Sequence, residues 1–255
     1  MKIALITDLH IGKPEEDTFH VDVRQNFLHI LQQVQQYQPE HLIINGDLSY
    51  MVGNLDTYLW MKSHLDALAI PYDMITGNHD DAGLLAEAFD RQADYHNGYL
   101  FYKRQLQDWN CLFLDTAPKM LSPTQLLWLE EQMNSSRGKN VMIFMHHPPV
   151  QVGAPFMDIH HSLLNQAEVQ AILATYDKVI PVFCGHYHTE KTIAFQNLIV
   201  QITPSCFFQI DPYSVDFQID DYRIAYRQID IAPDSWRSTV RYFKGHPLPK
   251  QEQTC

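Results

Sequence analysis

The chain carries histidine, aspartate and asparagine residues in short blocks, and these residue types suit metal binding. The last block, Gly185-His186-Tyr187-His188, follows a run of β-prone apolar residues. Side chains two positions apart in an extended strand point the same way, so the two imidazoles are expected to face one place. Gly185 lets the backbone turn there without a Cβ clash. A lone histidine is most often structural, so the interpretation depends on the other blocks.

Earlier blocks supply partners of the same kind. They are Asp8-Leu9-His10, Asn45-Gly46-Asp47, Gly77-Asn78-His79-Asp80 and His146-His147-Pro148-Pro149. Each block alone has a structural alternative, such as turn chemistry at Gly46-Asp47 or helix capping by Asp80. Together they indicate one cluster, because each follows a buried strand and open α/β sheets collect such strand ends at one edge.

The donor atoms select a class of metal and of reaction. Imidazole and carboxylate groups suit Zn, Fe and Mn, and no CxxC spacing offers paired thiolates. The candidate ligands are Asp8, His10, Asp47, Asn78, His146, His186 and His188. They exceed the needs of one ion, whereas two ions that share a carboxylate would use them all. Such a pair can hold both the attacking and the leaving oxygen of an in-line phosphoryl displacement.

Hydrophobic periodicity predicts the elements that position these blocks. Strands are predicted at 2–7, 41–45, 72–76, 140–145 and 178–184, and helices at 19–37, 54–69, 82–89, from Ser122 onwards and at 165–176. Two hairpin-like strands are predicted within 98–115, and further strands at 198–203, 221–231 and 236–243. The β-α-β-α-β-α order at the start favours a sheet covered by helices.

Composition limits the partners and the location. The net charge of −12 argues against a nucleic-acid surface, although bound cations can still attract an anionic substrate. No apolar run reaches the ~20 residues of a membrane span and the N-terminus lacks a signal peptide, so a cytoplasmic location is expected. We expect one domain over 1–246 and a flexible tail over 247–255. The apolar C-terminal β region makes a homodimer or a larger homo-oligomer plausible.

The five blocks, in this order, resemble those of the calcineurin-like metallophosphoesterases over residues 8–188. The stretches "HHPP", "GHYH" and "TPSCFFQI" are most similar to class III cyclic nucleotide phosphodiesterases and their glycerophosphodiesterase relatives. The resemblance implies an α/β fold, a four-layer α-β-β-α sandwich of two mixed sheets flanked by helices. A dinuclear metal site would lie at the carboxyl ends of the strands, and the strands from about residue 198 would form the second sheet.

Matched position by position, the resemblance also implies roles for the side chains. Asp8, His10, Asp47 and His188 would hold the first ion, and Asp47 would bridge to a second ion held by Asn78, His146 and His186. His79 and Asp80 would be the catalytic pair: His79 would stabilise the phosphoryl oxygens or protonate the leaving alkoxide, and Asp80 would orient His79 unless it caps a helix. Substrate contacts are expected from Asn78, His79, His147 and His161. Fe and Mn are the expected ions, with Zn or Co as alternatives.

The resulting hypothesis is a hydrolase that cleaves a small phosphodiester, with 3′,5′-cyclic nucleotides as the first choice, through a metal-bridging hydroxide. Glycerophosphodiesters, or phosphomonoesters in a broad-specificity enzyme, are the alternative substrates. A nuclease is disfavoured by the acidic charge, and a non-catalytic scaffold by the complete ligand set. Lys13 is the only basic residue beside the blocks, which favours a diester, because a dianionic monoester would usually require Lys or Arg clamps.

Overall fold

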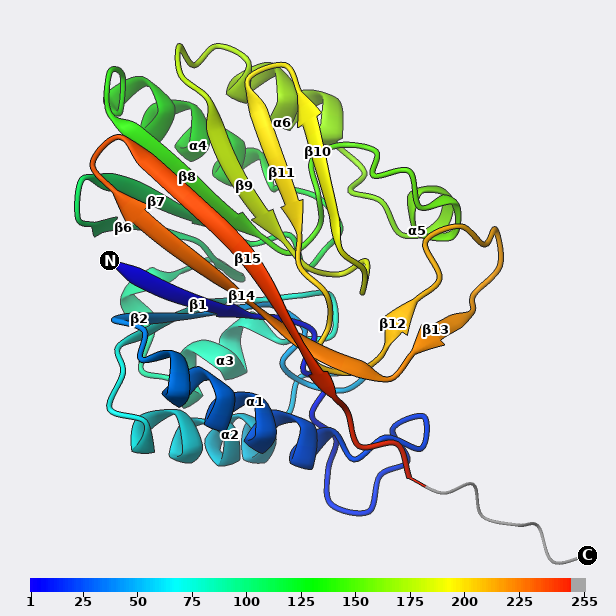
Figure 1. Cartoon of the computed structure of the whole chain (residues 1–255). Coiled ribbons are helices and arrows are strands. Elements are labelled where there is room, and N and C mark those ends of the chain that lie inside the picture. The colour runs from blue at the N-terminus through cyan, green and yellow to red at the C-terminus, as the bar shows by residue number, and fades with distance from the viewer. Residues whose placement is uncertain (249–255) are drawn as a thin grey trace, which may run out of the picture.

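The computed structural model describes residues 1–248 and contains two β-sheets that face each other between two layers of helices (Figure 1). One outer layer holds α1 (Val23–Tyr37), α2 (Leu55–Ala67) and α3 (Ala82–Ala88), and the other holds α4 (Pro123–Ser135) and α6 (Gln166–Leu173). The expected four-layer α-β-β-α sandwich is therefore confirmed. None of the helices within residues 1–248 is long and apolar enough to cross a lipid bilayer.

The first sheet has five strands in the order β15-β14-β1-β2-β3. Its strands are β1 (Lys2–Ile6), β2 (His41–Asn45), β3 (Tyr72–Ile75), β14 (Arg223–Ala232) and β15 (Ser235–Lys244). The first three run parallel, so their carboxyl ends lie at the same edge, while β14 pairs antiparallel with β1. The expectation that the strands after about residue 198 form the second sheet is wrong for β14 and β15. They pair beside β1, which would otherwise be an open edge strand with unpaired backbone groups.

The second sheet has six strands in the order β10-β11-β9-β8-β7-β6. Its strands are β6 (Tyr102–Leu106), β7 (Trp109–Leu114), β8 (Asn140–Met145), β9 (Ile180–Cys184), β10 (Lys191–Phe195) and β11 (Leu198–Ile202). It therefore begins at Tyr102 and not near residue 198. Strands β7, β8 and β9 run parallel, whereas β6 and β10 are antiparallel edges, so this sheet is mixed as expected.

The core between the sheets contains a ladder of aromatic rings. Tyr102, Phe113, Phe144 and Phe183 stack across β6 to β9 with ring centroids 4.7, 5.0 and 5.5 Å apart. Phe183 also lies 5.8 Å from Trp236 of β15, which joins the two sheets. Each of the three fully buried phenylalanines contributes about 2 kcal/mol by burial, so the ladder favours one register of the sandwich.

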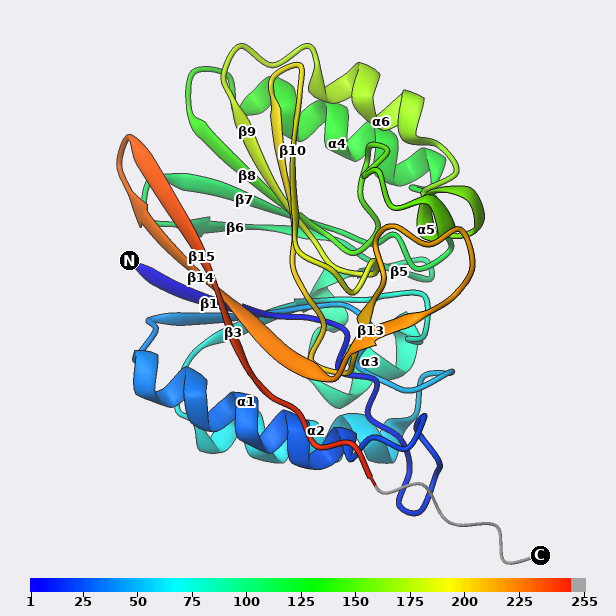
Figure 2. The same cartoon turned by 45° about the vertical axis from the view of Figure 1, so that its right-hand side comes forward.

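Short elements surround the edge where the parallel strands end. They are η1 (Gln92–Asp94), β4 (Tyr95–His96), β5 (Tyr99–Leu100), α5 (Pro155–His160), β12 (Gln209–Ile210) and β13 (Ile219–Asp221). The loop between β12 and β13 lies beside α5, where the Phe156 amide donates to the Ser214 carbonyl (Figure 2). Periodicity did not predict α5 or β10.

Helix α1 begins at Val23, because the Asp22 side chain accepts the Gln25 N–H and caps the helix there. The predicted start at residue 19 is therefore wrong, and Phe19 lies in the preceding loop. The helix predicted from Ser122 onwards is α4, which Ser122 caps by accepting the Gln125 N–H. The tail expected from residue 247 lies, beyond Leu248, outside the described residues. Leu248 itself donates to the His20 carbonyl at 2.6 Å.

Candidate metal centre and substrate cavity

The five blocks meet where β1, β2, β3, β8 and β9 end. Asn45 joins the two sheets at this point, since its side-chain amide donates to the carbonyls of Met145 at 3.1 Å and Phe183 at 3.3 Å. The Asp8 amide donates to the Gly46 carbonyl at 3.0 Å. These bonds hold strand ends from both sheets against each other, and the candidate ligands converge between them.

Asp8, His10 and His188 form the first cluster of candidate ligands, with donor atoms within 4.8 Å of one another. The Nε2 atom of His188 lies 3.2 Å from Asp8 Oδ1 and 3.2 Å from His10 Nε2. All three side chains are buried. Two imidazoles and a carboxylate that converge in a buried place form the kind of donor set that binds a divalent ion.

Asp47, His146 and His186 form the second cluster, again within 4.8 Å of one another. Asp47 Oδ2 lies 3.1 Å from His146 Nε2 and also 3.6 Å from His10 Nε2 of the first cluster. The Asp47 carboxylate is thus shared between both groups of ligands.

Two buried atoms provide a test of whether this arrangement fits a pair of metal ions. Asn78 Oδ1 and His146 Nε2 are buried and have no hydrogen-bond partner within the described part of the chain. A buried polar atom without a partner is unfavourable by about 1–3 kcal/mol. A cation in the second cluster would satisfy His146 Nε2, and Asn78 lines the same cavity as Asp47 and His186 of that cluster. Together with the first cluster, the residues present fit a metal pair.

Backbone carbonyls fix which ring nitrogen of each histidine is free. A carbonyl only accepts, so His146 Nδ1 donates to Asn45 O at 2.9 Å and His188 Nδ1 donates to Phe208 O at 2.9 Å. His186 instead uses Nε2, which donates to His161 O at 3.0 Å. The remaining nitrogen of each neutral ring carries the lone pair that a metal needs.

The backbone is left-handed at Asp8, His10, Asp47, His186 and His188, with φ values between 46° and 66°. Such a conformation costs about 1–3 kcal/mol for each non-glycine residue and is concentrated at functional sites in proteins. This left-handed backbone also corrects the interpretation of the last block, Gly185-His186-Tyr187-His188, as an extended strand. The chain is not extended there, and its two imidazoles join different clusters.

Glycines allow the close approach of neighbouring segments. A Cβ at Gly77 would overlap the Asp47 carboxylate, and one at Gly185 would overlap the Thr7 hydroxyl and the Asp8 carboxylate. Any side chain at these positions would displace a candidate ligand.

Charges inside the clusters alter the pKa values of the ligands. Burial favours the neutral acid at Asp8 and Asp47, yet the adjacent imidazoles hold both carboxyl pKa values below the ordinary range. Burial lowers the pKa of His10 to about 3, so this ring is neutral and able to ligate. Burial also disfavours charge on His146, but Asp47 and Asp8 raise its pKa to about 9. Metal binding would therefore displace a proton from His146.

His79 lies beside the clusters and is half-buried. Its amide donates to Asp47 Oδ1 at 3.0 Å, and its ring centroid lies 5.0 Å from that of His10. The ring Nδ1 donates to the Met51 carbonyl at 3.1 Å, which leaves Nε2 for other partners.

Neither role suggested for Asp80 is what the structure shows. Asp81 caps α3 by accepting the Leu84 N–H, and the Met51 carbonyl orients the His79 ring. The Asp80 carboxylate instead accepts the Tyr58 hydroxyl and the backbone N–H groups of Leu48, Ser49 and Gly77, at 2.9 to 3.1 Å. Burial and the Asp47 charge raise the pKa of Asp80 to about 6. Asp80 thus joins the strand ends that carry Asp47 and Asn78.

A cavity of about 410 Å³ opens beside the clusters. It is lined by the polar residues His10, Asp47, Asn78, His79, Lys119, His161, His186 and His188 and by the apolar residues Phe19, Tyr50, Met51, Phe156, Met157, Phe207, Phe208, Ile210 and Phe217. Asn78, His79 and His161 therefore lie where a substrate could be contacted. His161 directly follows α5 as its C-cap residue.

The expected substrate contact of His147 is wrong. Its side chain is fully buried, and its ring centroid lies 4.0 Å from that of His186. Its Nδ1 and its backbone N–H both pair with the Thr116 hydroxyl, at 2.9 and 3.0 Å. The His147 ring packs against the His186 ring and does not line the cavity.

Lys119 is a cavity residue that the sequence did not reveal. It follows β7 with a left-handed φ of 61°, and its carbonyl accepts the Leu164 N–H at 2.8 Å. Lys13, the basic residue noted beside the first block, lines a different pocket. Lys119 lies far from every block along the chain, so spacing provides no signal for it.

Comparison with known proteins shows one family. The family model for calcineurin-like phosphoesterases matches residues 1–190. A protein from Fibrobacter succinogenes named a probable cyclic nucleotide phosphodiesterase is 34% identical over 97% of this chain and 95% of its own length. A probable glycerophosphodiester phosphodiesterase from Arcobacter nitrofigilis is 27% identical over 82% of this chain and 80% of its own length.

A further relative and a solved structure are also similar to this chain. The 3′,5′-cyclic adenosine monophosphate phosphodiesterase of Escherichia coli (strain K12) is 25% identical over 94% of this chain and 88% of its own length. The crystal structure of a dimetal phosphatase from Danio rerio superposes with a TM-score of 0.67 at 14% identity, covering 96% of this chain and 98% of that one. At that identity the match establishes a common fold.

Proposed function

The chain belongs to the calcineurin-like phosphoesterase family, and we propose that it is a dinuclear metal-dependent phosphodiesterase acting on small diesters, above all 3′,5′-cyclic nucleotides. The observation that carries the proposal is the pair of ligand clusters that share Asp47 beside a cavity. The names of the relatives, which include cyclic nucleotide phosphodiesterases over nearly the whole chain, support the choice of substrate.

In the proposed centre, Asp8, His10 and His188 would hold one ion, Asn78, His146 and His186 would hold the other, and Asp47 would be shared between them. The short distances within both clusters and the unpartnered Asn78 Oδ1 support this assignment. Ions bound here would polarise a phosphoryl oxygen and supply a nucleophile at neutral pH. The nitrogen and oxygen donors fit iron and manganese, with zinc or cobalt as alternatives.

His79 is the proposed acid–base residue. Its Nδ1 is held by Met51, so a protonated ring presents Nε2–H, which can donate to a phosphoryl oxygen or to the leaving alkoxide. Asn78 and His161 line the same cavity and would contact the ester. Asp80 acts through the strand ends that it joins and does not touch the ester.

Hydrolysis of glycerophosphodiesters is the second candidate, favoured by the relative from Arcobacter nitrofigilis. Turnover of cyclic AMP, cyclic GMP, glycerophosphocholine, bis(p-nitrophenyl) phosphate and nucleoside monophosphates after metal reconstitution would test both. We expect the highest kcat/KM among the diesters, with little preference between adenine and guanine. A nucleoside monophosphate that exceeds both the cyclic nucleotide and the glycerophosphodiesters would overturn the proposal.

Three properties of the chain remain predictions: its domain organisation, its location and its self-association. We propose that residues 1–246 act as one domain, that the chain works in the cytoplasm, and that it self-associates. Limited proteolysis, cell fractionation and light scattering of the purified protein test these points in turn.

A further inference from the structure

Five phenylalanines form a continuous wall along the cavity. We call Phe19, Phe156, Phe207, Phe208 and Phe217 the aromatic wall. Successive ring centroids lie 4.1 Å apart for Phe207 and Phe208, 5.5 Å for Phe208 and Phe19, 6.1 Å for Phe19 and Phe217, and 5.8 Å for Phe217 and Phe156. The wall thus brings together side chains from the loop before α1, from α5, from the segment after β11 and from the loop after β12.

The wall begins at the candidate metal ligands and ends in solvent. The Phe207 ring lies 5.0 Å from the His10 ring, and the Phe208 ring lies 5.3 Å from the His188 ring. Both phenylalanines are almost fully buried, whereas Phe19 is 44% exposed and Phe217 is 42% exposed. Core packing therefore explains the inner members but not the two outer rings.

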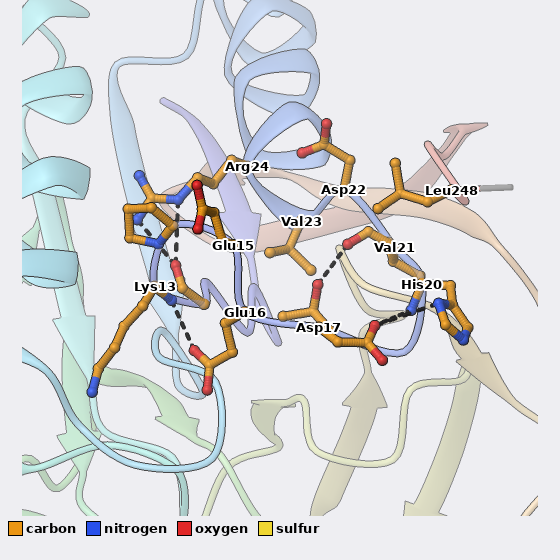
Figure 3. A pocket seen from close by; sticks show the side chains of 13 residues that line it. Lys13, Glu15, Glu16, Asp17, His20, Val21, Asp22, Val23, Arg24 and Leu248 are labelled. Atoms are coloured by element: carbon orange, nitrogen blue, oxygen red, sulfur yellow. Dashed lines mark hydrogen bonds and ion pairs between the residues drawn. The ribbon is translucent and has the colours of Figure 1, made fainter. Parts of the chain in front are cut away.

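Phe19 is held in its exposed position by its own loop. Its φ is 52° and that of His20 is 54°, an unfavourable conformation for residues other than glycine. In this loop the Asp17 carboxylate accepts the His20 N–H at 2.9 Å (Figure 3). The Thr18 hydroxyl donates to the Val21 carbonyl at 2.6 Å. The loop thus fixes a strained backbone that keeps an apolar ring at the mouth of the cavity.

We propose, on the basis of the proposed phosphodiesterase function, that the aromatic wall is the subsite that binds the organic group of the ester and favours a planar aromatic ring. When the phosphoryl group lies at the ligand clusters, a nucleobase reaches Phe19 and Phe217 and stacks on them. The outer part of the wall offers π faces and no hydrogen-bonding groups. It therefore discriminates aromatic from aliphatic esters, and not adenine from guanine.

The first test compares two diesters on metal-loaded protein. Phe217→Ala and Phe19→Ala should each lower kcat/KM for cyclic AMP about tenfold, mainly through KM, because stacking is lost equally in the ground and transition states. For glycerophosphoglycerol, whose organic groups carry neither an aromatic ring nor a cation that could bind a π face, kcat/KM should stay within about twofold. Tyr213→Ala is the matched control, since Tyr213 lies in the same loop as Phe217, is 83% exposed and is not among the cavity-lining residues.

Conservative variants separate stacking from packing. Phe217→Tyr keeps an aromatic ring and should have the wild-type activity on cyclic AMP. Phe217→Leu keeps apolar volume without a ring and should show the same loss as Phe217→Ala. Equal losses for both diesters in the alanine variants, or full cyclic AMP activity in Phe217→Leu, would overturn the inference.

A binding measurement separates this inference from the proposed function. Saturation-transfer NMR with adenosine, which lacks a phosphate, reports on the wall without any turnover. We expect transfer to the adenine protons in the wild type and its loss in Phe217→Ala, with no transfer to free ribose. If diesters are not hydrolysed but adenosine binds in this way, the proposed function fails and the aromatic subsite stands. If the enzyme hydrolyses diesters but shows no transfer to adenosine, the aromatic subsite fails and the proposed function stands.

Discussion

The Asp47 carboxylate lies 3.1 Å from the Nε2 atom of His146, deep between the ends of β2 and β8. The same carboxylate is 3.6 Å from His10, in the other cluster. One acidic group therefore faces ligands that come from both sheets. The electrostatic balance of the proposed centre depends on it, because without Asp47 the second ion would have no carboxylate and the first ion would have only that of Asp8.

The first prediction concerns this shared carboxylate. Asp47→Ala should leave neither ion tightly bound, whereas Asn78→Ala removes one neutral ligand and should weaken one ion only. Elemental analysis after gel filtration measures the metal content of each variant. Two tightly held ions per chain in Asp47→Ala would contradict the bridging assignment.

The second prediction separates His79 from the ligands. His79→Ala should keep its metal content and lose roughly 10²–10⁴-fold in kcat, the usual range for a positioned acid–base group. The loss should shrink for bis(p-nitrophenyl) phosphate, whose leaving group needs no proton. Release of a metal by His79→Ala would show that the ring is a ligand.

The blocks that carry the candidate ligands could be predicted from the sequence because each directly follows a buried strand. The position of a residue just after a strand can be seen in the local sequence, and parallel strands bring their carboxyl ends to one edge of the sheet. The structure gives Asp80 and His147 other roles than expected, because their partners, Tyr58 and Thr116, belong to other parts of the chain. No local pattern indicates such partners.

Long-range contacts account for the other differences. Periodicity located the strands that became β14 and β15 but contains no information about their pairing with β1. Lys119, Phe19 and Phe217 come from loops and Phe156 comes from the short helix α5, and only the assembled sheets define the positions of these segments. His41 is likewise buried in β2 through a distant partner, Asp73.

The third prediction uses that buried carboxylate. Asp73 is 3% exposed and contacts His41, Arg91 and Arg104. Burial disfavours its charge, but His41 and Arg91 lower the pKa of Asp73 to about 2, below the unfolded value. Its contribution to stability is therefore present above about pH 4 and is lost as the pH falls towards 2.

Asp73→Asn should accordingly lower the free energy of unfolding at pH 7 by about 3 kcal/mol, the range for a broken buried pair. The variant should also lose part of the decline in stability between pH 4 and pH 2. Urea titrations of both proteins measure this difference. Asp66→Asn is the control, because its ion pair with Lys62 is half-exposed and contributes about 0.5 kcal/mol. An equal effect of the two substitutions would contradict the assignment.

The last prediction concerns how the cavity distinguishes a monoester from a diester. Lys119 places a positive charge on the cavity wall, and its field acts on the whole charge of the bound ester. A phosphomonoester carries about one more negative charge than a diester near neutral pH, since the second phosphate pKa is about 6. Coulomb energy is proportional to that charge, so removal of the lysine should cost a monoester about twice the free energy that it costs a diester.

Lys119→Met is therefore expected to lower kcat/KM about fivefold for cyclic AMP and about 25-fold for a nucleoside monophosphate, with both effects reduced by added salt. Lys13→Met provides the matched control, since Lys13 lines a separate pocket and its loss should change neither substrate. Equal losses for the two esters would mean that Lys119 supports the shape of the cavity and does not select charge.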